Sequence, residues 1–204
     1  MQVTLHGIDE RAPVRIRQQG RMTHEDFYEF CAANPDLRVE LTAEGDIIIM
    51  PPAGAETGYR NSELARQLGN WSRQDGRGRA FDSNTEFLLP DGSALCPDAS
   101  WVERTRLAKL TREQKRKFTP LVPDFIVELT SPSDRLPRVR KNMEAWIANG
   151  VKLGWLLDAD RRMAYIYRPR RDDAEKLNAP AKLKGEGPVA GFVLDLAEIW
   201  DPDL

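Results

Sequence analysis

The segment from Asp124 to Thr130 constrains the fold most, because its apolar run predicts a buried strand of the protein core. Apolar residues at helical spacing follow it as far as Trp146, and Gly150 is typical of a helix end, so a helix is expected over 134–149. The run 153–157 then predicts another strand. A chain that alternates strands and helices in this way is typical of the α/β class.

The same patterns predict the remaining elements. Two more helices are expected, at 24–33 and 56–74, and further strands at 38–41, 47–50, 85–89, 98–102, 163–168 and 192–196. Residues 1–20 are polar and aperiodic, so they predict an N-terminal arm. The order of the elements predicts a single α/β domain over 21–204, with a mixed sheet flanked by helices.

Composition narrows the class of protein. The chain has 204 residues, of which 41% are hydrophobic and 30% charged, as in ordinary globular proteins. Its longest apolar runs, 47–50 and 155–157, are far shorter than the roughly 20 residues that cross a bilayer. The N-terminus does not have the pattern of a signal peptide, and Cys31 and Cys96 do not suggest a disulfide framework. We therefore expect a cytoplasmic protein with no membrane partner.

Positive charge is concentrated in three segments although the net charge is −2. Residues 103–117 contain seven basic and two acidic side chains, while 135–141 contain four basic and 161–171 five basic side chains without an acid. Such segregation suits a polyanionic partner that meets one face of the protein. Solvated helix and loop surface is the alternative interpretation of each segment.

Several common sites are excluded by residue type. The two histidines, His6 and His24, lie near the N-terminus, and no His or Cys spacing supports a zinc site. Neither histidine accompanies a nucleophile motif, and the chain has no phosphate-binding loop or GxGxxG pattern. Any chemistry must therefore come from carboxylates, a lysine and a metal ion that prefers oxygen ligands.

Three carboxylates are candidates. Glu128 interrupts the apolar run of the expected core strand, and an unpaired carboxylate there would cost several kcal/mol, so it needs an Arg, a Lys or a cation as partner. Asp98 follows Pro97 at the start of another strand, and Glu40 lies on the polar face of strand 38–41. The structural alternatives are a buried salt bridge for Glu128, a turn residue for Asp98 and a solvent-facing residue for Glu40.

A second Pro-Asp pair, ending in Asp124, competes with Pro97-Asp98. Asp124 and Glu128 share one strand but lie about 13 Å apart at 3.3 Å per residue, too far to share one metal ion. Sheet pairing can place Asp98 about 5 Å from Glu128 on a neighbouring strand. We therefore pair Asp98 with Glu128 and interpret Asp124 as a strand-start residue.

The order of motifs closely resembles the Uma-type restriction endonuclease family of the PD-(D/E)xK nuclease superfamily, over about residues 20–200. The motifs that carry the resemblance are Arg38-Val39-Glu40-Leu41, Met50-Pro51-Pro52, Leu89-Pro90-Asp91-Gly92, Cys96-Pro97-Asp98, Val127-Glu128-Leu129-Thr130-Ser131 and Asn149-Gly150-Val151. Each motif is short, but the ordered set is specific. The resemblance implies a restriction-endonuclease-like mixed β-sheet flanked by α-helices.

The resemblance also implies an activity: a Mg²⁺-dependent endonuclease that acts on DNA, with Mn²⁺ as a substitute, in a homodimer. It places the metal on Asp98 and Glu128, with Glu40, at the position of the family's upstream glutamate, as a third ligand. The family's lysine, on the helix after Glu128, falls on Asn142 here, and Lys141 is one residue earlier, turned by about 100°. Lys141 is thus the fourth candidate catalytic residue.

Two alternatives to an active nuclease remain open. The first is a catalytically weak or inactive nucleic-acid-binding protein that retains the nuclease fold, which the departure at Asn142 supports. The second is a structural or interaction domain without a nucleic-acid partner. Metal-dependent cleavage distinguishes the nuclease from both, and salt-sensitive DNA binding distinguishes the two alternatives from each other.

Overall fold

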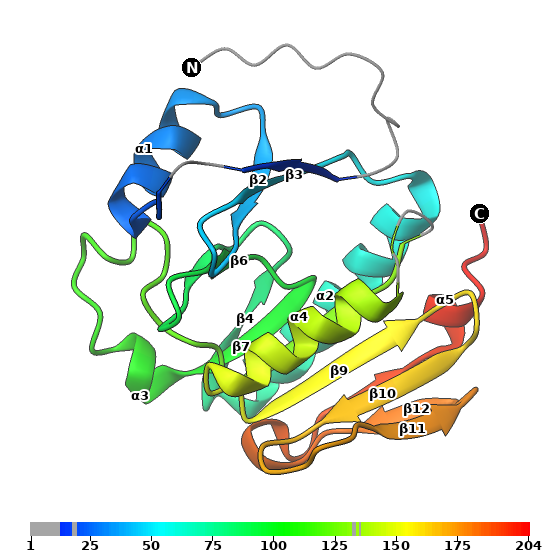
Figure 1. Cartoon of the computed structure of the whole chain (residues 1–204). Helices are drawn as coiled ribbons and strands as arrows, with labels where there is room; N and C mark the ends of the chain where they lie inside the picture. The colour runs from blue at the N-terminus through cyan, green and yellow to red at the C-terminus, as the bar shows by residue number, and fades with distance from the viewer. Residues whose placement is uncertain (1–12, 18–19, 132–133, 135) are drawn as a thin grey trace.

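The computed structural model describes residues 13–17, 20–131, 134 and 136–204, and two sheets organise it (Figure 1). The larger sheet has six strands in the order β11 (Glu175–Asn178), β10 (Met163–Tyr167), β9 (Leu153–Asp158), β8 (Phe125–Leu129), β7 (Ala99–Glu103) and β4 (Gly78–Asp82). β8 and β9 are parallel, whereas the other neighbours are antiparallel. The mixed sheet of an α/β protein is therefore confirmed.

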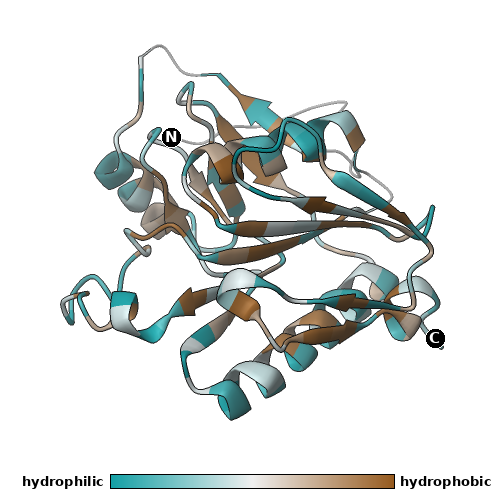
Figure 2. Cartoon of the chain, turned by 90° about the horizontal axis from the view of Figure 1, so that it is seen from below, coloured by the Kyte–Doolittle hydropathy of each residue, from teal (hydrophilic) through white to brown (hydrophobic). Residues whose placement is uncertain are grey.

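Two long helices cover opposite faces of the larger sheet. Leu64 and Leu68 of α2 (Ala55–Asp75) pack in one cluster with Val127, while Met143 of α4 (Leu136–Ala148) packs in another with Ile126. Because side chains alternate along a strand, successive residues of β8 face different helices. In Figure 2 the hydrophobic colour is concentrated in the central strands.

The smaller sheet lies beside the larger one and carries the first candidate residue. Its five strands have the order β1 (Val14–Ile16), β3 (Ile47–Met50), β2 (Arg38–Leu41), β6 (Ala94–Leu95) and β5 (Phe87–Leu88). Gly45, with φ of +92°, makes the turn between β2 and β3, where a residue with a side chain would be strained. This hairpin places Glu40 of β2 opposite Ile48 of β3.

Helix α1 (His24–Ala33) covers the smaller sheet. The Thr23 hydroxyl accepts from the backbone N–H of Asp26, and the Asp26 carboxylate accepts from the backbone N–H of Thr23, a capping box that fixes the helix start. Phe27 is the fully buried residue of this helix, packed among Val39 and Leu41 of β2. The helix predicted over 24–33 is therefore confirmed to the residue.

Most of the predicted elements are present, with local differences. The strands at 38–41 and 47–50 have the expected bounds, and each of the three expected helices begins and ends within two residues of its expected bounds. The strand expected over 85–89 is reduced to β5, and five strands were not predicted, namely β1, β4, β6, β11 and β12. Within the described ranges, no helix is long and apolar enough to cross a membrane.

The N-terminal region contributes more than the sequence indicated. Val14, Arg15 and Ile16 pair with Ile49, Ile48 and Ile47, so part of the expected arm is an edge strand of the smaller sheet. Its three residues are too short for a periodicity to be recognised. Residues 1–12 and 18–19, which make up most of the expected arm, lie outside the described residues, so the division at residue 20 stays a prediction.

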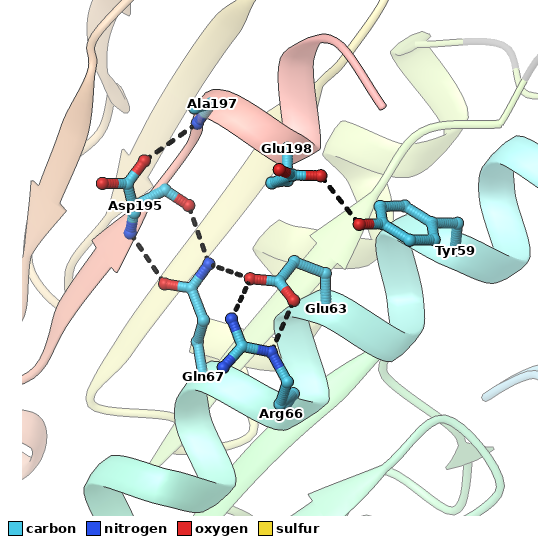
Figure 3. A network of polar contacts seen from close by, with 7 residues as sticks. All are labelled: Tyr59, Glu63, Arg66, Gln67, Asp195, Ala197 and Glu198. Atoms are coloured by element: carbon cyan, nitrogen blue, oxygen red, sulfur yellow. Dashed lines mark hydrogen bonds and ion pairs between the residues drawn. The ribbon is translucent and has the colours of Figure 1, made fainter. Parts of the chain in front are cut away.

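The C-terminal region holds helix α2 in place, as Figure 3 shows. The Gln67 side chain accepts from the backbone N–H of Asp195 at 2.8 Å and donates to the same residue's carbonyl at 3.0 Å. The Tyr59 hydroxyl donates to Glu198, and the Arg60 guanidinium donates to the carbonyl of Ile199 in α5 (Ala197–Trp200). These bonds fix the first half of α2 against the hairpin β12 (Lys182–Lys184) and β13 (Val193–Asp195) and against α5.

Candidate active site

Asp98 and Glu128 lie opposite each other at one end of the larger sheet. β7 and β8 are antiparallel with Ala99 paired to Val127, so the next step of the register sets Asp98 against Glu128. The arrangement expected from the sequence is therefore present. The two carboxylates come from segments that are thirty residues apart, and it is the sheet that brings them together.

Each carboxylate of the pair is held by hydrogen bonds from neutral donors. Asp98 accepts at Oδ2 from the backbone N–H of Leu129, at 2.8 Å, and at Oδ1 from the side-chain amide of Asn61, at 3.0 Å. Glu128 accepts at Oε1 from the indole N–H of Trp146, at 2.9 Å. Among the described residues Glu128 has no ion pair, so the buried salt bridge considered as its structural alternative is not formed there.

Glu40 reaches the same site from the smaller sheet. Its Oε1 atom accepts from the backbone N–H of Cys96 at 3.4 Å, two residues before Asp98. The solvent-facing placement considered for Glu40 is wrong, because the side chain is turned into a pocket that Asp98 and Glu128 also line.

The pocket encloses about 650 Å³, and two arginine side chains line it together with the three carboxylates. Arg38 of β2 and Arg138 of α4 line it together with Glu40, Asp98 and Glu128. Arg38 donates to the carbonyl of Ser83 at 3.1 Å, and Arg138 pairs with Asp134 at 2.5 Å. The start of α2 forms another wall. Both arginines are anchored by the protein at one nitrogen, an arrangement that positions a guanidinium for an anion.

The negative charges of the three carboxylates repel one another. Burial raises the pKa of Glu128 well above its usual range, and the charges of Asp98 and Glu40 raise it further, against the bond from Trp146. Burial also raises the pKa of Asp98 and of Glu40, although in both cases hydrogen bonds and the charge of Arg38 oppose the effect. A cluster of this kind gains stability from a cation bound among its oxygens.

Asp124 belongs to the opposite end of β8. Its carboxylate is fully buried, accepts from the backbone N–H of Glu103 at 2.9 Å, and pairs with Arg106 and Lys152, each at 2.8 Å. Burial acts to raise the pKa of Asp124, but the bonds from Lys152, Glu103 and Arg106 outweigh it and lower that pKa. The structural role predicted for Asp124 agrees with these contacts.

The structure does not bring Lys141 to the carboxylates. Lys141 is exposed on α4, and its charge acts on Glu44 in the turn between β2 and β3, whose pKa is lowered first by a bond to Thr42 and further by Lys141. Asn142, the next residue, lines the pocket instead. Within the described part of the chain no lysine lines the pocket, so its positive charges come from arginine.

Two of the three carboxylates suit a hard divalent cation. Asp98 and Glu128 offer carboxylate oxygens from facing strands, and Mg²⁺ is commonly held by one or two carboxylates, with waters and substrate phosphate completing the shell. In the described ranges, however, no three His, Cys, Asp or Glu side chains are placed to hold one ion together. The pair therefore fits the cation, while Glu40 as a third metal ligand stays a prediction.

The three basic segments begin at different ends of the larger sheet. Arg104 follows β7 beside Asp124, so the segment 103–117 starts at the end of the sheet away from Asp98, where Figure 1 shows α3 (Arg104–Leu107). The segment 161–171 is divided by β10, which leaves Arg161 and Arg162 at the pocket end. Of the segment 135–141, Arg138 lines the pocket and Arg135 lies outside the described residues. A single polyanion face that includes all three segments stays a prediction.

Several residues of the site were not predicted from the sequence. Asn61, Trp146, Arg38 and Arg138 contact or line it, and none was a candidate. Glu86 was also missed. It is 7% exposed behind the pocket, where its Oε2 atom accepts from the Cys96 thiol at 2.7 Å and burial raises its pKa to about 8.

These features define a class: an α/β protein with a nuclease-like arrangement of paired carboxylates on two central strands. The chain belongs to the Uma2 family, described as "putative restriction endonuclease", which matches residues 24–197. The resemblance drawn from the motifs is thereby confirmed. No protein with curated function matches the sequence.

A solved structure with a similar fold agrees with this assignment, whereas a second alignment is weak. One is the crystal structure of a putative nuclease belonging to DUF820 from Anabaena variabilis ATCC 29413, with 22% identity and a TM-score of 0.72. The alignment covers 88% of this chain and 97% of that one, so the two share a fold over nearly their whole length. The cryoEM structure of a DrdV–DNA complex aligns with 61% of this chain and 11% of that chain at 13% identity, and its TM-score of 0.37 is too low to indicate a shared fold.

Proposed function

We propose that this protein is a metal-dependent endonuclease that hydrolyses phosphodiester bonds in DNA. One observation carries the proposal: Asp98 and Glu128 line the same pocket, where neutral donors hold their carboxylates and two arginines lie beside them. Membership of the Uma2 family supports a nuclease activity. The choice of DNA and the need for a metal are the steps that this proposal adds.

Asp98 and Glu128 would hold Mg²⁺, or Mn²⁺ in its place, with Glu40 beside them. When bound, the ion activates a water molecule and polarises the scissile phosphate, which lowers the barrier to hydrolysis. Asn61, Trp146 and the backbone of Leu129 keep the two carboxylates in place, so that no reorganisation is needed when substrate arrives.

Arg38 and Arg138 bind the substrate and stabilise negative charge. A guanidinium forms two parallel hydrogen bonds to a phosphate, and both arginines line the pocket next to the carboxylates. They offset the repulsion between the acidic site and a phosphate backbone, the role that a lysine has elsewhere in the superfamily. Lys141 is a candidate for that role only if it moves from its exposed position on α4.

A homodimer belongs to the same proposal, because it would place one site on each strand of a duplex. Sedimentation of the purified protein with and without duplex DNA tests it. The cytoplasmic location expected from the sequence likewise stays a prediction.

The second candidate function is a nucleic-acid-binding protein with weak or no cleavage. It is favoured by one observation, the position of Lys141 outside the pocket and of Asn142 inside it. The arginines and the fold would then bind DNA while the chemistry is slow or absent.

A plasmid-nicking assay tests the proposal. Wild-type protein with Mg²⁺ or Mn²⁺ should convert supercoiled plasmid to open circles, and excess chelator should abolish the conversion. Asp98→Asn and Glu128→Gln should be inactive, whereas Asp124→Asn, a matched change at the other end of β8, should cleave when folded. Cleavage that persists in chelator rejects the metal mechanism, and metal-independent binding without cleavage favours the second candidate.

A further inference from the structure

Glu128 accepts a hydrogen bond from a fully buried residue of α4. The indole N–H of Trp146 donates to Oε1 of Glu128 at 2.9 Å, and the Trp146 side chain is fully buried. Its ring meets Phe87 edge to face, with centroids 6.5 Å apart. Packing around the fully buried ring therefore restricts the direction of its N–H.

The bond selects which Glu128 oxygen is free. Trp146 occupies Oε1, and within the described residues the structure records no hydrogen bond to Oε2. The Oε2 atom is thus left for a ligand in the pocket that Glu128 lines. Asp98, in contrast, is held at both oxygens, by Asn61 and by the backbone of Leu129.

We propose that Trp146 is a positioning residue: its indole N–H orients Glu128 for a divalent cation shared with Asp98. The inference rests on the proposed function and names a residue that acts through Glu128 without touching metal or substrate. Groups that orient a metal ligand typically contribute 10- to 100-fold to metal affinity. A merely structural tryptophan would contribute to stability and leave metal affinity unchanged.

Trp101 provides a matched control. It is 2% exposed, and its indole N–H also donates to a side chain, the Ser72 hydroxyl, at 3.1 Å. It packs on the α2 face of the sheet and does not line the pocket. Replacing either tryptophan by phenylalanine removes one buried indole and one hydrogen bond, so the cost in stability should be similar while the effect on metal binding should differ.

Isothermal titration calorimetry with Mg²⁺ and with Mn²⁺ on the full chain makes the comparison. Trp146→Phe should weaken metal binding 10- to 100-fold, and Trp101→Phe should leave it within twofold of wild type. Equal affinities in wild type and Trp146→Phe, or equal losses in both variants, overturn the inference. A wild-type protein that binds neither ion overturns the proposed function itself, which is a separate outcome.

A second measurement does not require the variant to fold. In ¹⁵N-labelled wild type, saturating Mg²⁺ should shift the indole N–H resonance of Trp146, identified through its contacts to the Phe87 ring, and leave that of Trp101 in place. The shift should vanish in Glu128→Gln. A Trp146 resonance that is unchanged at saturating metal rejects the positioning role.

Discussion

Asp98, the residue before β7, lies beside Glu128 of β8, and the backbone N–H of the residue after Glu128 donates to Asp98. The pairing of the strands and the orientation of the carboxylate are thus fixed by the same two segments. A change of register by one residue would turn Glu128 to the other face of the sheet, towards α2, and dismantle the site. Sheet register is therefore the structural basis of the candidate active site.

Glu128→Gln should leave the metal-free protein as stable as wild type or more stable, by about 1 kcal/mol. The glutamine keeps an acceptor for Trp146 and removes a charge that Asp98 and Glu40 repel. Because the pKa of Glu128 is higher in the folded protein than in the unfolded chain, the free energy of unfolding of the wild type falls as pH rises above the pKa of the unfolded chain. The glutamine does not ionise, so the variant does not have this loss.

Thermal unfolding at pH 7 with and without Mn²⁺ measures both parts of this prediction. The variant should also lose most of the rise in Tm that metal gives the wild type, because that rise depends on affinity for the folded state. A strong destabilisation of metal-free Glu128→Gln, with metal making no difference to either protein, would reject the assignment of the site.

The sequence supports part of the site for a specific reason. Glu128 was recognisable because a charged residue in an apolar strand needs a partner, and Asp98 because strand pairing could reach it. Asn61 carried a comparable signal that was missed: it lies three residues before Leu64 and seven before Leu68, on the buried stripe of α2. A polar residue on that stripe indicates a buried partner, here Asp98.

Trp146 and the short strands could not be predicted in the same way. Tryptophan counts as apolar in a periodicity, so its position on the buried face of α4 predicted core packing and hid the N–H that reaches Glu128. β4 and β6 pair with strands distant in sequence, and the two residues of β6 are too few for a period. Their existence depends on tertiary contacts.

Asp124→Asn should destabilise the protein by about 2–3 kcal/mol and leave metal affinity unchanged. The carboxylate is fully buried, but Arg106 and Lys152 are partly exposed, so the cost is lower than for a wholly buried ion pair. Since the pKa of Asp124 is lowered, its stabilisation is present at neutral pH and is lost as pH falls through the folded value. Urea unfolding at pH 7 and at pH 3 checks the sign, and a variant as stable as wild type at pH 7 contradicts it.

Glu86→Gln should stabilise the protein more at pH 9 than at pH 5. With its folded pKa raised to about 8, wild-type Glu86 binds a proton that the unfolded chain releases, so wild-type stability falls between about pH 4.5 and pH 8. The glutamine can still accept from the Cys96 thiol, and the gain at pH 9 should be of order 3 kcal/mol. Exposed Glu29→Gln is the control, and an equal pH dependence in both variants would show that Glu86 is not the cause.

Lys141→Ala should cleave DNA within about twofold of wild type, whereas Arg38→Ala should lose cleavage by tenfold or more. Lys141 is exposed outside the pocket, and Arg38 lines it. One lost charge-assisted hydrogen bond, at about 1.5–3 kcal/mol, corresponds to this loss. Single-turnover nicking rates measure both, and a Lys141→Ala protein that is folded but inactive would restore the lysine to the catalytic set.

Substitution of the cations at the pocket end should change the salt dependence of DNA binding more than substitution of those at the opposite end. Arg138 lines the pocket, and the turn between β9 and β10, at the same end of the larger sheet, contains Arg161 and Arg162. At the other end of the sheet α3 begins, and it is followed by exposed Arg112, Lys115 and Arg116. Each lost phosphate contact reduces the slope of log K against log salt by about 0.9.

Neutralising the first trio should therefore reduce the slope by up to about 2.7, and neutralising the second should leave it unchanged. Fluorescence anisotropy with labelled duplex over a range of KCl concentrations measures the slope, in calcium or without metal so that cleavage does not interfere. Two trios with equal effects would mean that DNA extends along the whole sheet. An effect of the second trio alone would place the bound DNA away from Asp98 and Glu128, and the pocket would then not be where the protein holds its substrate.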